Sequence, residues 1–187
     1  MAVTHGDGPL LIFAGAGSGK TRTLTHRIAY LITQTNVAPE RILAVTFTNK
    51  AAAEMRERLA ALVGDRARRL WMGTFHALCA RMLRISGKDI DIDQHFVIFD
   101  SDDTVRLMKD IVKNANVDSD RYPPARVLSK ISDAKNSMQT PDDLLKVAAS
   151  PNDRVTAQLY RTYAERLKAS NALDFDDFLV EAVRLLN

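Results

Sequence analysis

The sequence predicts an α/β fold with a parallel sheet, followed by a helical region. Three short apolar runs, at residues 10–14, 42–47 and 70–72, have the length and composition of buried strands. A helical pattern follows each run, and strands that alternate with helices are joined by crossovers into a parallel sheet. All eight glycines lie at or before Gly87, and from about residue 100 the pattern is helical throughout.

Each predicted helix of the first half has one apolar face and a clear end. Leu24, Ile28 and Leu31 share a face of the helix that follows the first strand. The helix after the second strand ends at Gly64, and the helix after the third ends at Gly87. These three units are the expected framework of the sheet.

Helix starts in the second half are marked by residues that cap helices. Asp100 opens one helix, and Pro123 and Pro124 separate it from the next. Thr140 is an expected N-cap, and a further helix is expected over residues 153–168. Asp174 opens the last helix with three carboxylates in four residues, which suits the positive end of a helix.

Composition indicates a globular protein with a basic first half. Hydrophobic residues make up 46% and charged residues 26% of the 187 positions, and no apolar run is long enough to span a membrane. Residues 1–86 hold 12 Lys/Arg against 5 Asp/Glu, whereas residues 87–187 hold 14 against 18. A basic half suits a polyanion such as a nucleotide or nucleic acid. Cys79 is the single cysteine, which excludes an internal disulfide, and the N-terminus lacks the pattern of a signal peptide, so we expect a reducing, cytoplasmic location.

A phosphate-binding loop is predicted between the first strand and the first helix. Its glycines let successive backbone N–H groups face a phosphate, and the helix adds its positive end. The Lys20 ammonium is expected to reach the β- and γ-phosphates of ATP, and the Thr21 hydroxyl to ligate Mg²⁺. The strict pattern begins with glycine where this chain has Ala14. The expected loop residues are Ala14, Gly15, Ala16, Gly17, Ser18, Gly19, Lys20 and Thr21.

This loop and three later segments resemble the superfamily-one helicases of the UvrD, PcrA and Rep group. Residues 46–52 (TFTNKAA) are similar to the second motif of that family, and residues 73–78 (GTFHAL) to its next DNA-contact motif. Residues 173–178 (LDFDDF) resemble the acidic-aromatic segment that shortly precedes the Walker B strand. The four motifs occur in the family's order across nearly the whole chain.

The resemblance implies a RecA-like P-loop NTPase domain that binds ATP, Mg²⁺ and single-stranded DNA. Arg22 joins the loop residues at the nucleotide. The implied DNA contacts are Thr46, Phe47, Thr48, Asn49, Lys50, Thr74, Phe75 and His76. Hydroxyls, amides and helix-end N–H groups hold phosphates without reading sequence, and Phe47 offers a face on which a base can stack. We also considered Phe47 as sheet core and His76 as a structural hydrogen-bonding residue.

By the same resemblance, residues 1–87 form part of the RecA-like domain, residues 88–168 a helical insertion, and residues 169–187 the return to the first domain. In that insertion Lys130, Lys135 and Lys146 are candidates for contacts with duplex DNA, with solvated helix faces as the alternative.

We further expect the chain to be an N-terminal fragment with a truncated sheet, because neither an adenine-recognising glutamine motif nor a Walker B Asp-Glu pair occurs in it. The parent is then an ATP-dependent 3′-to-5′ helicase acting with a second RecA-like lobe, and the fragment alone binds without turnover. A small P-loop phosphotransferase, such as a nucleotide kinase, is the alternative. It leaves residues 46–52 and 73–78 unexplained.

Overall fold

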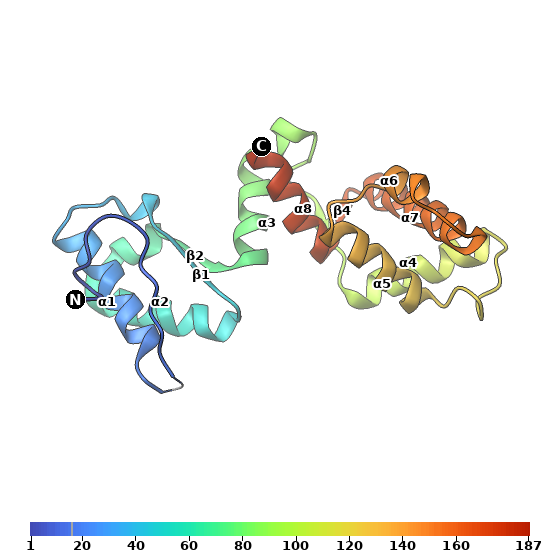
Figure 1. Cartoon of the computed structure of the whole chain (residues 1–187). Coiled ribbons are helices and arrows are strands. Elements are labelled where there is room, and N and C mark those ends of the chain that lie inside the picture. The colour runs from blue at the N-terminus through green and yellow to red at the C-terminus, as the bar shows by residue number, and fades with distance from the viewer. Residues whose placement is uncertain (16) are drawn as a thin grey trace. The chain divides into compact units, whose positions relative to one another are not determined.

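The computed structural model describes residues 1–15 and 17–187, so the predicted loop residue Ala16 lies outside the described residues. These residues form two compact units, 1–78 and 79–187. Each unit combines helices with a two-stranded parallel sheet. The predicted α/β class with parallel pairing is therefore confirmed, and the element labels are those of Figure 1.

The first unit is built around the parallel pair β1 (Leu43–Thr46) and β2 (Trp71–Thr74). The connection between them contains α2 (Asn49–Val63) and the short 3₁₀ helix η2 (Gly64–Arg69). Helix α1 (Lys20–Thr33) packs against α2, and η1 (Pro39–Arg41) leads into β1. Apolar side chains from both helices and both strands form one core: Ile28, Ala29, Ile32, Ile42, Ala44, Met55, Leu59, Val63, Ala67, Leu70 and Met72.

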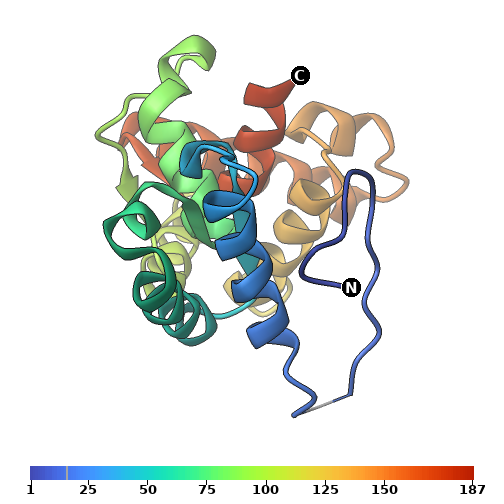
Figure 2. The same ribbon diagram turned by 90° about the vertical axis from the view of Figure 1, so that its left-hand side faces the viewer.

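The strand predicted at residues 10–14 is not formed. Figures 1 and 2 show the chain before α1 as an irregular trace, and the side chains of Leu11 and Phe13 are 76% and 90% exposed. A buried parallel strand needs neighbours that pair with its backbone and cover both of its faces. In the described sheet β1 pairs with β2, and residues 10–14 have no place in that pairing. The apolar run therefore lacks the sheet that its composition requires.

The buried face of α1 differs from the predicted one. Thr25, Ile28, Ala29 and Ile32 are buried, whereas Leu24 is 40% exposed. Thr25 can replace a leucine on this face because its hydroxyl donates hydrogen bonds to backbone carbonyls one turn earlier in the helix. The apolar pattern predicted the helix correctly and placed its buried stripe one position away.

The second unit is mainly helical. Its elements follow α3 (Phe75–Ser86), which begins in the first unit, in this order: η3 (Gly87–Ile90), β3 (Val97–Ile98), α4 (Ser101–Asn114), α5 (Pro124–Asn136), α6 (Pro141–Lys146), α7 (Pro151–Ala169), β4 (Ala172–Leu173) and α8 (Phe175–Leu186). Helix α3 ends just before Gly87, a position where the chain approaches closely, since a Cβ there would lie 3.2 Å from Ile92. The sequence did not predict the short parallel pair β3–β4, which joins residues 97–98 to residues 172–173.

Capping residues fix the starts of these helices as predicted. Asp100, Thr140 and Asp174 each accept a hydrogen bond from the backbone N–H three residues later, and each of those residues returns a carboxylate to the cap. The helices α4, α5 and α7 then enclose a core that includes Met108 and Tyr163, both with no exposed surface. A smaller cluster of Leu83, Phe96 and Phe178 lies in the same unit, and Cys79 packs against it.

Candidate functional site

The predicted phosphate loop has a backbone that requires glycine at two positions. Gly17 has a φ of 74° and Gly19 a φ of 89°, both in the left-handed region that favours glycine. A Cβ at Gly15, Gly17 or Gly19 would meet nothing within 4 Å among the described residues. The loop therefore leaves open space beside its backbone, as close approach of a phosphate requires.

Lys20 begins α1 and folds back on the loop. Its ammonium donates hydrogen bonds to the backbone oxygens of Ala14 (2.9 Å) and Gly15 (2.6 Å), and the Ser18 hydroxyl donates to the Gly15 oxygen at 2.7 Å. The first turn of α1 has no acidic residue, and its N-cap Gly19 has no side chain that could cap it. The N–H groups of this helix start are therefore open to an anionic ligand, with no capping carboxylate in competition.

The chemistry of this donor set fits a polyphosphate with its metal ion. Backbone N–H groups and an ammonium are donors for phosphate oxygens, and the half-buried Thr21 hydroxyl, next to Lys20, is a ligand type that Mg²⁺ accepts. Arg22 follows on the same turn with an exposed guanidinium side chain. Among the described loop residues, the donor groups are thus of the kinds that a polyphosphate accepts.

The two predicted DNA motifs lie side by side at the carboxyl ends of β1 and β2. Thr46 and Thr74 are partners in the parallel register, and the residue that follows each strand is an aromatic, Phe47 after β1 and Phe75 after β2. Phe47 is 92% exposed and Phe75 50%, with ring centroids 6.1 Å apart and planes tilted by 52°. The interpretation of Phe47 as sheet core is therefore wrong.

Threonine hydroxyls of these motifs stabilise the N-terminal ends of two helices. Thr48 caps α2 by accepting a hydrogen bond from the Ala51 N–H at 3.1 Å, and Thr74 accepts from the Ala77 N–H at 3.3 Å. The Thr46 hydroxyl donates to the Thr48 oxygen at 3.1 Å. These hydroxyls thus anchor two helix starts at the same sheet edge.

Polar side chains of the two motifs surround the exposed aromatics. Asn49 and Lys50 occupy the first turn of α2 and are exposed, whereas His76 is half-buried in the first turn of α3. Arg56, one helical turn and a half further along α2, donates to the Met72 oxygen at 3.1 Å and so supports β2. Cationic and aromatic groups therefore share this edge of the first unit.

The lysines predicted to contact duplex DNA differ in their surroundings. Lys130 is paired with Asp153 at 3.7 Å and Lys146 with Asp143 at 3.0 Å, both on exposed surface. Lys135 is only 4% exposed, because its ammonium lies 2.6 Å from carboxylate oxygens of Asp174 and Asp177. The expectation that Lys135 reaches a phosphate is therefore wrong.

Asp174 and Asp177 act as the helix-capping pair that the sequence predicted. The Asp177 N–H donates to Asp174 at 2.9 Å, and the Asp174 N–H donates to Asp177 at 3.1 Å. The Tyr163 hydroxyl adds a hydrogen bond to Asp174 at 2.8 Å. The roles of Lys135 and Tyr163 carry no signal in the sequence, since 39 and 11 residues separate them from Asp174.

Arg27 is a second residue that the sequence did not single out. Its guanidinium donates to the backbone oxygens of Ala2, Val3, His5 and Gly6, with the shortest contact 2.8 Å long at His5. This residue on α1 thereby holds the segment that leads toward the phosphate loop. Long-range bonds of a side chain to backbone oxygens leave no pattern that a sequence reveals.

Within residues 1–15 and 17–187, no group of three or more His, Cys, Asp or Glu side chains is arranged to hold a metal ion. In the same residues, no helix combines the length and the apolar character needed to cross a membrane.

Comparison with known proteins identifies the family. Residues 1–187 match the UvrD/REP helicase N-terminal domain. The chain is 47% identical over 184 residues to the ATP-dependent DNA helicase PcrA of Staphylococcus aureus and, over the same length, to that of Staphylococcus epidermidis. The alignments cover 98% of this chain and 25% of each relative, so the chain spans about a quarter of their length. The chain belongs to the UvrD/REP helicase N-terminal domain family.

Proposed function

We propose that the chain is the ATP-binding and single-stranded-DNA-binding N-terminal portion of an ATP-dependent DNA helicase that translocates 3′ to 5′. The observation that supports this most is the register of Thr46 with Thr74, which places an exposed aromatic at the end of each of two adjacent strands. Relatives that are 47% identical are named as ATP-dependent DNA helicases. Because the proposed ligands are ATP and DNA, we also propose that the protein acts in the cytoplasm, at the nucleoid.

In the proposed nucleotide site, the loop holds the phosphates and α1 supplies its positive end. Lys20 exchanges its two backbone oxygens for phosphate oxygens when ATP enters. The Thr21 hydroxyl would hold Mg²⁺, and the bound ion would supply positive charge beside the phosphates. Arg22 lies on the same helix turn and completes the contacts with the nucleotide.

In the proposed DNA site, Phe47 and Phe75 stack with bases while polar groups hold the backbone. Stacking on an aromatic ring tolerates any base, since every base has a flat face. Lys50 supplies salt-dependent attraction to phosphates, and Asn49 and His76 supply hydrogen bonds that carry no sequence information. The site therefore suits a motor that moves along DNA regardless of sequence.

We propose further that these 187 residues bind nucleotide without turning it over. Hydrolysis needs a carboxylate to orient water and cationic groups to stabilise the transition state. Asp174 and Asp177 cannot serve, because their oxygens are occupied by Lys135 and by the start of α8. The second RecA-like lobe is the proposed source of the arginines.

The test uses a longer form of the protein that includes the second lobe. ATPase activity is measured with and without single-stranded DNA, in the unchanged protein and in Lys20→Ala. We expect stimulation by DNA that the variant loses. Absence of stimulation contradicts the proposal, as does Lys20-dependent turnover by the 187 residues alone.

A further inference from the structure

A buried cluster of charges joins three elements of the second unit. Lys135 comes from α5, Tyr163 from α7, and Asp174 and Asp177 from the start of α8. The side chains of Lys135, Asp174 and Asp177 are 4%, 10% and 15% exposed. The cluster thus holds two carboxylates for one ammonium group in a site with little water.

Two carboxylates that share one buried cation cannot both ionise at their ordinary pKa, because the second negative charge is left without compensation. Asp174 has the better environment, since it accepts hydrogen bonds from Lys135, from the Tyr163 hydroxyl and from the Asp177 N–H. Asp177 accepts from the Asp174 N–H and pairs with Lys135. The geometry therefore assigns the extra proton to Asp177.

We propose that the cluster of Lys135, Asp174 and Asp177 is a proton-binding device that fixes the start of α8 more firmly to α5 in mildly acidic solution. Uptake of one proton leaves one carboxylate for one ammonium, and the like-charge repulsion between the two aspartates disappears. The inference concerns the second unit alone and does not depend on the proposed function.

The charges around the cluster agree with this assignment. Burial raises the pKa of Asp177 to about 6, whereas Lys135 and hydrogen bonds hold the pKa of Asp174 below its usual value despite burial. Burial opposes the charged form of Lys135, but the two aspartates together raise its pKa, so it stays an ammonium group. The titratable groups that face Asp177 are Lys135 from α5, Tyr160 and Tyr163 from α7, and Asp174 and Asp176 from α8.

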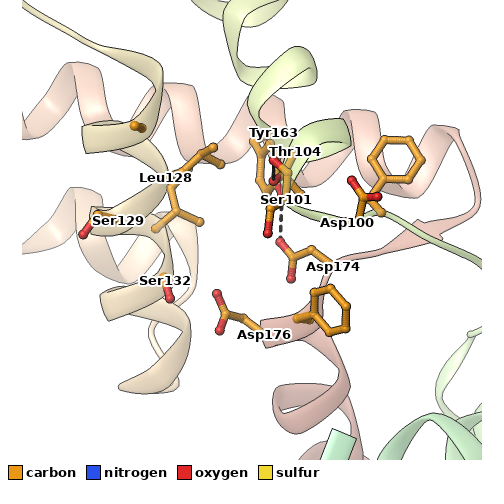
Figure 3. A pocket seen from close by; sticks show the side chains of 13 residues that line it. Asp100, Ser101, Thr104, Leu128, Ser129, Ser132, Tyr163, Asp174 and Asp176 are labelled. Atoms are coloured by element: carbon orange, nitrogen blue, oxygen red, sulfur yellow. Dashed lines mark hydrogen bonds between the residues drawn. The ribbon is translucent and has the colours of Figure 1, made fainter. Parts of the chain in front are cut away.

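The cluster also borders a cavity, on the side of Asp174 and Tyr163. A cavity of about 280 Å³ is lined by groups that include Thr104, Ser132, Tyr163, Asp174 and Asp176. Figure 3 shows the hydrogen bond between Tyr163 and Asp174, with Asp176 in the first turn of α8. Asp176 lies beside the cluster without joining Lys135, and so it is a matched control.

The sign of the effect opposes ordinary acid denaturation. A carboxyl group whose pKa is higher in the folded state binds more protons there than when unfolded, so stability increases as the pH falls through that pKa. With a pKa of about 6 for Asp177 against an ordinary 3.8, we expect the unfolding constant to fall about tenfold from pH 7 to pH 5. Carboxylates with lowered pKa values, such as Asp143, lose their contribution only below that range.

The experiment is a urea-unfolding series between pH 5 and 7.5 on the chain, on Asp177→Asn and on Asp176→Asn. We expect the gain in stability from pH 7 to pH 5 to be absent in Asp177→Asn and present in Asp176→Asn. The second variant is the control because it removes the same charge from the neighbouring residue. Carboxyl NMR titration of the unchanged chain measures Asp177 directly and does not require a stable variant. A midpoint near 6 supports the device, while an ordinary midpoint near 4, or an equal pH response in the two variants, overturns it.

Discussion

Phe47 and Phe75 follow directly on register partners of the two parallel strands of the first unit, and their ring centroids lie 6.1 Å apart. Each ring is exposed by half or more. Burial of apolar surface stabilises folded proteins, so an exposed aromatic pair contributes little to the fold. The exposed pair agrees with the proposed stacking of bases, and the first prediction tests that role.

Phe47→Ala is expected to weaken binding of single-stranded DNA by about 1–3 kcal/mol for the base that stacks on it. Fluorescence anisotropy with labelled oligo-dT and oligo-dA measures the effect, which is expected to be similar for both. Phe13→Ala removes another exposed aromatic, 90% accessible, and is expected to leave DNA binding unchanged. A loss confined to one base argues for readout of base edges.

Lys20→Ala is expected to abolish binding of ATP while the far-ultraviolet circular dichroism spectrum stays the same. Lys20 is exposed, and the backbone oxygens of the nearby Ala14 and Gly15 accept the hydrogen bonds of its ammonium, so the core does not depend on it. Titration with a fluorescent ATP analogue measures the loss. Lys50→Ala is the matched control, since it removes an exposed lysine at the other motif and is expected to weaken DNA binding alone. Unchanged ATP affinity in Lys20→Ala refutes the assignment of the loop.

Lys135→Met is expected to destabilise the second unit by about 3–5 kcal/mol, because it leaves two buried carboxylates without their cation. Lys130→Met removes a lysine on the same helix whose side chain is 45% exposed in its ion pair with Asp153, and its cost is expected to stay below about 1 kcal/mol. Urea unfolding at pH 7.5 measures both. Similar small costs for the two variants disprove the structural importance of the buried cluster.

Arg27→Ala is expected to free residues 2–6 from α1 and to cost about 1–3 kcal/mol, since charged hydrogen bonds to four backbone oxygens are lost. Limited proteolysis with N-terminal sequencing reports the release of the segment. Arg22→Ala, on an exposed position of the same helix, is expected to leave the cleavage pattern unchanged in the absence of nucleotide. Equal cleavage of both variants counts against the clamp.

Local signals predicted most of the elements, and long-range contacts account for the failures. Capping residues such as Thr140 and Asp174 fixed helix starts, because a cap acts within four residues of itself. The run at residues 10–14 was read as a strand from composition, but strand formation depends on partners elsewhere in the chain. The β3–β4 pair depends on such distant partners too, and a two-residue strand has no periodicity to detect.

The candidate site follows the same division. The phosphate loop and the two strand-end motifs are contiguous in sequence, so their residues could be named before the structure was known. The sequence does not decide whether Phe47 is buried or exposed, since an apolar run can end in a phenylalanine whether or not that residue belongs to the core. Lys135 was misplaced because nothing near it in the sequence shows the two aspartates that bury it.

The parallel pairing of β1 with β2 also determines which sequence changes the two motifs tolerate. Side chains alternate between the faces of a strand, so deletion of one residue between Trp71 and Thr74 moves Phe75 to the opposite face and away from Phe47. A substitution in one of these strands alters a single contact. A one-residue shift of the strand register, by contrast, separates Phe47 from Phe75. Homologous chains that keep this pair are therefore expected to vary in residue type along these strands while preserving their length.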